Sequence, residues 1–440
     1  MLQYLPAYIH LNAHALVPAM QKRPQKFLFI HQNFPGQFVH IATELTRLGH
    51  EVVALGIKGR AVAGVKFLRY QPEAPARVSD IEVAIDFETK IVRGIACARV
   101  MEQLKASGFT PDVVVAHPGW GEALFCKDVW PAVRLVMFAE FFYGTQGTDY
   151  NFDPEFTTDT LAARMRLRIK NAVHLHALHA ADAIYAPTQW QASQLPPVYR
   201  SKTQVIFDGI DTQHVKPNAQ ASIYLQREGI TLNAQSEVIT FVNRNLEPYR
   251  GFHVFMRALP EILRQRPNAH VLIIGRDEVS YGSPPKTGGT WRHAMLTEVG
   301  AQLPMARVHF LGGLPFEDYL RVMQISSCHV YLTYPFVLSW SCVEAMSAAR
   351  VVVASRTGPV TEVIEHGTNG LLFDFFDVAA LSSQIVEVLT RPEKFAHLGV
   401  QARETVVERY DLQTRCLPAL LQLIAPRVNP DDEILSVDNN

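Results

Sequence analysis

Two arginines in the second half of the chain have the chemistry and the spacing to bind a diphosphate. Arg244 ends the strand-like run SEVITFVNR, and Arg250 follows six residues later, just before Gly251 and a helix-like sequence. Guanidinium groups that converge near the start of a helix can neutralise a diphosphate through paired hydrogen bonds. The alternative is that both are surface arginines in a loop between a strand and a helix.

A glutamate lies in an unusual setting further along the chain. Glu344 is surrounded by apolar and small residues in SWSCVEAMSAARVVVAS. With Ser341 it fits a capping box, Ser-x-x-Glu, in which the carboxylate accepts the backbone N–H of the serine. In the other reading the start of this helix faces a ligand, with amides meeting phosphate and the carboxylate accepting two hydroxyl hydrogens of a ribose. The local sequence leaves both readings open.

Polar residues also follow strand-like runs in the first half of the chain. Gly36 and Gln37 come after KFLFIH, His117 ends PDVVVAH, and Glu140 ends VRLVMFAE. Amides at a glycine turn can receive an anion or a sugar hydroxyl, and a neutral histidine can hydrogen-bond a substrate. The alternatives are a turn glycine, a histidine with a structural role, and a carboxylate that caps the next turn.

Length and composition limit the classes of protein to which the chain can belong. With 440 residues it is expected to form two domains of roughly 200 residues each. A content of 48% hydrophobic and 19% charged residues with a net charge of −1 indicates large cores and no affinity for nucleic acid. No apolar run approaches the roughly 18–20 residues of a membrane span. The cysteines are Cys97, Cys126, Cys328, Cys342 and Cys416, which form no CxxC pair and indicate reduced thiols in a cytosolic protein.

Strand-like and helix-like stretches alternate along the chain, and the pattern restarts near residue 237. This alternation predicts parallel sheets, and thus an α/β protein of two doubly wound Rossmann-like domains that face each other across a cleft. Helical spacing is found in Ile85–Ser107 and Thr158–Ala180. The predicted boundaries are an N-terminal extension (1–26), a first Rossmann-like domain (27–212), a polar linker (213–236), a second Rossmann-like domain (237–405), a C-terminal helix (406–426) and a tail (427–440).

The motifs and their order resemble the retaining glycosyltransferases of the GT-B fold, specifically glycosyltransferase family four. RNLEPYRG resembles the family's Arg-x(4–6)-Lys-Gly, with Arg250 in place of the lysine. VHFLG, VEAMSAARVVVAS and TGPVTEVIEHGTNGLLF resemble three further family motifs. The resemblance implies that the domain 27–212 binds the acceptor, that the domain 237–405 binds the nucleotide sugar and that the helix 406–426 crosses back to the first domain. It also implies that Arg244 and Arg250 hold the donor diphosphate, that Glu344 binds its ribose and that His117 lies beside the transferred sugar. It extends donor binding to the turn and loop residues Gly36, Gly275, Arg276, Phe310, Leu311, Ser339, Trp340 and Ser341, and sugar or acceptor binding to Gln37, Glu140 and Phe336.

Phe336 is the main departure from the family pattern. The family's Glu-x7-Glu pair would have its first glutamate at this position, where it contacts sugar hydroxyls, and a phenyl ring accepts no hydrogen bond. Either Ser339 or Ser341 contacts the sugar instead, or the donor binds differently, or the enzyme is impaired. The long loop LIIGRDEVSYGSPPKTGGTW is either a binding loop or an inert excursion.

The resemblance implies a metal-independent hexosyltransferase without a cofactor, which takes a nucleotide sugar such as a UDP-sugar and builds a polysaccharide or glycoconjugate. Its expected partners are the donor and a carbohydrate or lipid-linked acceptor, its expected location is cytoplasmic, and its oligomeric state is left open. The basic stretch 161–176 is either a solvated helix face or a contact for an anionic acceptor at the inner membrane face. Two alternatives remain: a non-catalytic nucleotide-binding subunit of a partner transferase, and another GT-B enzyme such as a sugar-nucleotide epimerase.

Overall fold

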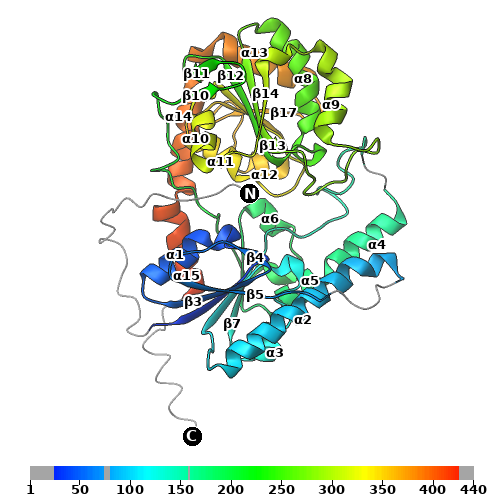
Figure 1. Cartoon of the computed structure of the whole chain (residues 1–440), viewed down its shortest axis with the longest axis vertical. Coiled ribbons are helices and arrows are strands. Elements are labelled where there is room, and N and C mark those ends of the chain that lie inside the picture. The colour runs from blue at the N-terminus through cyan, green and yellow to red at the C-terminus, as the bar shows by residue number, and fades with distance from the viewer. Residues whose placement is uncertain (1–23, 74–79, 157–158, 426–440) are drawn as a thin grey trace. The chain divides into compact units, whose positions relative to one another are not determined.

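The computed structural model describes residues 24–73, 80–156 and 159–425 of the chain (Figure 1). The tail predicted at 427–440 and the extension predicted at 1–26, apart from residues 24–26, lie outside these ranges. The described chain forms two compact units. The N-terminal unit contains residues 24–146, 154–208 and 413–425, and the C-terminal unit contains Gly147–Asp153 and Gly209–Leu412.

The N-terminal unit is built on a seven-stranded sheet of order β5-β3-β1-β6-β7-β8-β9 in which all neighbours are parallel. The strands are β1 (Lys26–Ile30), β3 (Glu51–Gly56), β5 (Val65–Arg69), β6 (Val113–Ala116), β7 (Arg134–Phe138), β8 (Ala183–Ala186) and β9 (Thr203–Val205). A short pair, β2 (Asn33–Phe34) and β4 (Lys58–Gly59), lies beside it. The central strands are almost wholly apolar and buried, as expected for a parallel sheet covered on both faces.

In the N-terminal unit, the direction in which the chain moves across the sheet determines which face of the sheet each helix covers. From β1 to β3 the chain moves one way, and from β6 to β9 it moves the other way, so right-handed crossovers place the helices on two opposite faces. The helices are α1 (Val39–Arg47), α2 (Ile85–Ala106), α3 (Cys126–Val129), α4 (Leu161–Lys170), α5 (Ala172–Ala180), α6 (Gln189–Ser193), α7 (Pro197–Arg200) and α15 (Leu417–Ile424), with 3-10 turns η1 (Gly36–Phe38), η2 (Glu82–Ala84) and η3 (Pro118–Trp120).

The C-terminal unit repeats this plan with a six-stranded parallel sheet of order β14-β13-β12-β15-β16-β17. Its strands are β12 (Val238–Asn245), β13 (His270–Arg276), β14 (Val308–Gly312), β15 (Cys328–Tyr331), β16 (Val352–Ser355) and β17 (Leu371–Phe373). Its helices are α8 (Phe252–Gln265), α9 (Trp291–Val299), α10 (Phe316–Gln324), α11 (Trp340–Ser347), α12 (Gly358–Thr361), α13 (Val378–Thr390) and α14 (Pro392–Arg409), with the 3-10 turns η4 (Pro248–Arg250), η5 (Gly300–Gln302) and η6 (Met305–Arg307). The π-helical turn η7 (Leu412–Cys416) leads from the C-terminal unit into α15.

The two parallel sheets confirm the predicted fold class, and α2 confirms the helix expected over Ile85–Ser107. Two local features were not expected from the sequence. The helix expected over Thr158–Ala180 is interrupted at Asn171, whose side chain bonds both the N–H and the carbonyl of Tyr143 instead of facing solvent. Within the polar stretch 213–236, β10 (Ser222–Leu225) and β11 (Ile230–Asn233) form an antiparallel hairpin that belongs to the C-terminal unit.

Strand order reverses once in each sheet, and these reversals determine where ligands can bind. The reversal falls between β1 and β6 in the N-terminal unit and between β12 and β15 in the C-terminal unit. At such a point the helices after the two strands lie on opposite faces, which leaves the carboxyl ends of both strands accessible. Candidate sites are therefore expected at these two positions.

None of the described helices has both the length and the apolar character required to span a membrane.

Buried histidines couple the stability of both units to pH. Burial lowers the pKa of His31 to about 4, that of His174 to about 3 and that of His329 to about 3. His329 lies in β15, where Thr240 bonds its Nδ1 at 2.9 Å and no described charged group pairs with it. Since each of these side chains is neutral when folded and takes up a proton near pH 6.5 when unfolded, acidification favours the unfolded chain.

We predict that the free energy of unfolding falls as pH is lowered from about 7.5 to 5.5, by on the order of 1 kcal/mol for each of these histidines. Urea denaturation of the full native chain and of full-length His329→Gln at both pH values, followed through the transition of the C-terminal unit, measures the contribution of His329 to this pH dependence. The difference between the two pH values is expected to shrink in His329→Gln. An equal pH dependence in both chains would contradict this assignment.

Candidate functional site

Arg250 is a buried cation at the strand reversal of the C-terminal unit. It ends the turn η4, just after β12, and it is 5% exposed. Its Nη1 donates to Thr333 Oγ1 at 2.8 Å and to the carbonyl of Val337 at 2.8 Å, both in the segment that follows β15. The two loops that flank the reversal are therefore held together by one guanidinium group.

Aromatic rings cover the faces of this guanidinium. The centre of the Phe336 ring lies 5.6 Å from Arg250 Cζ, and that of the Tyr281 ring lies 5.2 Å from it. The two rings pack edge to face at 4.9 Å, and Tyr249 packs edge to face on Phe336 at 5.6 Å. Phe336, at the position where the family pattern has a glutamate, is thus a packing partner of Arg250.

Arg244 differs from Arg250 in its exposure. It lies near the carboxyl end of β12, is exposed, and makes no hydrogen bond or ion pair with any described residue. Arg276 is also exposed and ends the neighbouring strand β13, where it pairs in register with Asn245. Gly275 lies against Leu246, at a distance that leaves no room for a side chain. The sequence predicted that Arg244 and Arg250 act together. In the structure the side chain of Arg244 is exposed and that of Arg250 is buried.

Glu344 lies inside α11 and does not take part in a capping box. The helix begins at Trp340 with Ser339 as its N-cap residue, so Ser341 is already within the helix and the capping-box reading was wrong. The Glu344 carboxylate is 5% exposed and accepts a hydrogen bond from the Tyr319 hydroxyl at 2.5 Å. The N–H of Ser339 donates to the Tyr331 hydroxyl at 2.8 Å, and Ser339 and Ser341 hydroxyls lie 3.2 Å apart.

The edge strand β14, on the opposite side of this sheet from β17, contains Phe310 and Leu311. Both side chains are half-buried. Arg292 packs over the Phe310 ring with its Cζ 5.1 Å from the ring centre. These two residues are separated from the strand reversal by β13, which lies between β12 and β14. They thus border the reversal instead of forming it.

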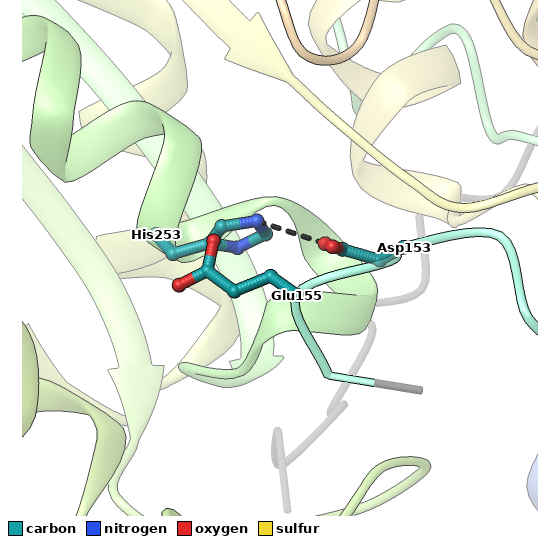
Figure 2. Close-up of side chains that lie close together, drawn as sticks. All are labelled: Asp153, Glu155 and His253. Atoms are coloured by element: carbon teal, nitrogen blue, oxygen red, sulfur yellow. Dashed lines mark ion pairs between the residues drawn. The ribbon is translucent and has the colours of Figure 1, made fainter. Parts of the chain in front are cut away.

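The segment Gly147–Asp153 belongs to the C-terminal unit although its neighbours in the chain belong to the other unit. Asp149 accepts a hydrogen bond from the Tyr249 hydroxyl at 2.8 Å. Asp153 accepts one from Tyr334 at 2.7 Å and pairs with His253 at 3.0 Å in a fully buried contact (Figure 2). Asp153 and His253 thus form a buried pair within the C-terminal unit; Glu155, also drawn in Figure 2, belongs to the N-terminal unit.

At its own strand reversal, the N-terminal unit carries a chain of hydrogen-bonded polar side chains. Glu140 accepts hydrogen bonds from Gln37 Nε2 at 2.9 Å and from His117 Nε2 at 3.3 Å. Gln37 Oε1 in turn accepts one from His31 Nε2 at 3.0 Å. The Nδ1 atoms of His31 and His117 accept backbone N–H groups, of Asn33 and Gly119, which assigns the hydrogen to Nε2 in both neutral rings.

Close packing fixes the rings of this network. His117 stacks on Trp120 with ring centres 3.9 Å apart, and His31 meets the same Trp120 edge to face at 4.9 Å. Gly36 has a φ of +51°, and a Cβ there would lie 2.4 Å from the His31 ring, so only glycine fits. Gly36, Gln37, His117 and Glu140 thus lie together at the carboxyl ends of β1, β6 and β7.

Most of the positive charges of the basic helix α4 are engaged within their own unit. Arg164 pairs with Asp159 at 2.5 Å, Arg166 pairs with Glu82 at 3.2 Å, and the Lys170 ammonium lies 3.6 Å from the centre of the Tyr143 ring. These contacts favour the solvated helix face over a free anion-binding patch.

Sequence reasoning did not identify four residues that shape the two candidate sites. His31 and Trp120 complete the network around His117, and Glu247 and Tyr281 flank Arg250. A signal existed for His31, because it directly follows the first buried strand. Glu247 and Tyr281 lie in loops whose local sequence has no periodic pattern, and they meet only in the folded chain.

Comparison with protein-family models gives two matches. Residues 48–215 match the model described as glycosyl transferase family 4 group, and residues 224–405 match the model described as glycosyl transferases group 1. The two matches follow each other along the chain and together include most of both units.

Individual relatives agree with these models. The D-inositol 3-phosphate glycosyltransferase of Corynebacterium efficiens is 26% identical over 316 residues, which is 69% of each chain. Other curated relatives match over only 57% and 47% of their own length.

Solved structures share the fold at low sequence identity. The sucrose-phosphate synthase of Thermosynechococcus elongatus superposes with a TM-score of 0.67 at 17% identity, over 94% of this chain and 100% of that one. The Anabaena protein Alr3699/HepE in complex with UDP-glucose gives 0.63 at 17% identity, over 94% and 99%. With two parallel α/β units and matches to both family models, the chain belongs to the family 4 group of GT-B glycosyltransferases.

Proposed function

We propose that the protein transfers a hexosyl group, with retention of configuration, from a nucleoside diphosphate sugar to a hydroxyl acceptor. The supporting observation is the strand reversal between β12 and β15, where exposed Arg244, buried Arg250 and the start of α11 follow the two strands. Cations and helix amides are the groups that stabilise charge developing on a leaving diphosphate. Alr3699/HepE, which shares the fold, was solved with UDP and glucose and with UDP-glucose, and a UDP-sugar is thus the first donor to test.

In this reaction the bond between the sugar C1 and the diphosphate oxygen breaks, and a bond from C1 to the acceptor oxygen forms on the same face. The acceptor proton passes to the leaving phosphate oxygen, so no dedicated protein base is required. The charges on Arg244 and Arg250 would take the role that a divalent cation has in other transferases, and we therefore propose that neither metal nor cofactor is needed. The Gln37 amide, and His117 once its Nε2–H leaves Glu140, would offer hydrogen bonds to the transferred sugar or the acceptor.

The N-terminal unit would supply the acceptor site, with the network of His31, Gln37, His117 and Glu140 at its centre. A carbohydrate or lipid-linked hydroxyl suits these neutral donors and the one carboxylate. For a lipid-linked acceptor, peripheral contact at the inner membrane face of a cytoplasmic enzyme belongs to the same proposal. The product would be a polysaccharide or glycoconjugate.

A second candidate function is a nucleotide-binding subunit without catalytic activity. Phe336 supports it, because the carboxylate of the family pattern is absent from that position. Such a subunit would bind the nucleotide and release no product. A sugar-nucleotide epimerase would release nucleotide or an altered sugar without forming an acceptor product.

A thermal-shift titration with UDP, GDP and ADP tests the donor site, and Arg244→Ala tests which part of the ligand it binds. One nucleotide is expected to stabilise the native chain, by about 2.7 kcal/mol at 100 times its dissociation constant. Arg244→Ala is expected to weaken the nucleoside diphosphate about tenfold, the effect of one charge-assisted hydrogen bond, and the monophosphate much less. Since Arg244 is exposed and has no partner among the described residues, the melting temperature of the unliganded variant should not change.

Arg264→Ala is the matched control, because Arg264 is an exposed arginine of α8 paired only with Glu261. It should leave both affinities unchanged. Absence of a shift with all three nucleotides would rule out a working donor site. Equal losses of diphosphate and monophosphate affinity in Arg244→Ala would remove Arg244 from the phosphate site.

Glu344→Gln should weaken the nucleoside diphosphate and the monophosphate by the same factor, because both carry the ribose that the carboxylate would bind. Calorimetric titration with both ligands measures this factor. Tyr319→Phe removes the hydroxyl that bonds Glu344 but keeps the carboxylate, and it should retain most of the affinity. If both variants lower the melting temperature and neither changes affinity, Glu344 serves only to join α11 to α10.

A further inference from the structure

Arg250 is a buried cation. Burial lowers the pKa of its guanidinium, but interactions with Tyr331, Tyr281 and the Glu247 charge together raise that pKa by more. Its Nη1 is bonded to a hydroxyl and a carbonyl, its faces are covered by rings, and no described carboxylate forms an ion pair with it. A buried cation is costly unless an anion or a set of well-placed dipoles compensates it. The site is therefore suited to receive an anion from outside the chain, and the precision of that binding depends on what holds the guanidinium in place.

Glu247 is the buried carboxylate nearest in the chain to Arg250, and it is used differently. It is fully buried, and its two oxygens accept the backbone N–H groups of Ser280 at 3.2 Å, Tyr281 at 3.1 Å and Gly282 at 3.0 Å. These three amides are consecutive and open the long glycine- and proline-rich loop after β13. Asn245 reinforces the same point by donating to the Ser280 hydroxyl at 2.6 Å.

The backbone of Glu247 acts on Arg250 from the other side. The carbonyl of Glu247 accepts the N–H of Arg250 at 3.1 Å and closes the turn η4. Gly251, directly after Arg250, has a φ of +68°, and a Cβ there would lie 2.3 Å from Leu332, so the turn has little freedom to shift. One residue thus fixes the backbone of Arg250 through its carbonyl and the ring that covers Arg250 through its carboxylate.

We propose that Glu247 is a positioning residue for the donor diphosphate, which seats Tyr281 on Arg250 and thereby sets the orientation of the guanidinium against Phe336. This inference rests on the proposed function. If Glu247 has this role, the loop after β13 is not an inert excursion, and it supports the site without binding the ligand itself. It supplies one ring to the cation, and the carboxylate that anchors it does not contact the ligand.

A positioning role for Glu247 differs from a purely structural role in its effect on ligand selectivity. Glu247→Gln keeps the volume but places an amide NH₂ against backbone N–H donors, which should release Tyr281 from Arg250. Diphosphate affinity is then expected to fall about tenfold, and monophosphate affinity by much less. Tyr281→Ala should reproduce this selective loss. Tyr281→Phe keeps the ring over the cation but removes the hydroxyl that also bonds Arg250, and it should therefore retain most of the affinity.

Glu237→Gln is the matched control. Glu237 precedes the opposite end of β12 and forms a paired, partly buried contact with Arg266. It should cost stability as Glu247→Gln does but leave the ratio of diphosphate to monophosphate affinity unchanged. Hydrogen exchange of the amides of residues 280–282 provides a readout without ligand, and these amides are expected to lose protection in Glu247→Gln alone.

The outcomes distinguish this inference from the proposed function. If the native chain binds no nucleoside diphosphate, both fail. If the native chain binds one and Glu247→Gln and Tyr281→Ala lower both affinities equally or not at all, the positioning role alone is overturned. Unchanged exchange at residues 280–282 in Glu247→Gln would also overturn it, because the loop would then not depend on the carboxylate.

Phe336→Glu restores the glutamate of the family motif. A repair of the motif would raise donor affinity, but we expect diphosphate affinity to fall. A carboxylate placed beside Arg250 would neutralise it within the chain, and diphosphate affinity should fall about tenfold or more. Phe336→Leu, which removes the ring without adding charge, should cause a smaller loss and shows whether the site tolerates a change there. A gain in diphosphate affinity or turnover in Phe336→Glu would contradict the view that Phe336 keeps Arg250 available for an external anion.

Discussion

The right-handed crossover between parallel strands is the constraint on which both candidate sites depend. Because the connections in one direction across a sheet lie on one face, a reversal of strand order leaves two neighbouring loops without a helix between them. In the C-terminal unit this brings Arg250, after β12, against Thr333 and Phe336, after β15. In the N-terminal unit it brings Gln37, after β1, toward the residues that follow β6 and β7.

Burial of a cation at such a reversal has a cost, and the surroundings of Arg250 show how it is offset. Hydroxyl and carbonyl acceptors use the edge of the guanidinium, and aromatic rings stabilise its faces without cancelling its charge. The pair of Glu247 and Arg250 illustrates a division of labour within one short turn. Glu247, three residues before Arg250, accepts hydrogen bonds from the backbone amides of residues 280–282 and forms no ion pair with the guanidinium.

The sequence was sufficient for the fold class and for the loops that carry the sites, because buried parallel strands give long apolar runs and ligands bind after them. It was not sufficient where a residue has partners far away in the chain. Ser341 and Glu344 match a capping box, but the approach of the chain to α11 makes Ser339 the N-cap. The hairpin of β10 and β11 was missed because its strands are short and half polar. The contact of Glu247 with residues 280–282 has no local signature at all.

The segment Gly147–Asp153 has a consequence for how the chain can be divided. It lies far before the C-terminal unit in sequence, yet Asp149 and Asp153 bond Tyr249, His253 and Tyr334 within that unit. An excised fragment that begins at residue 209 would expose these buried partners, and a chimera joined at the linker would import carboxylates from the wrong parent. Recombination between members of the family is therefore compatible with this architecture only when the short segment and the C-terminal unit are inherited together.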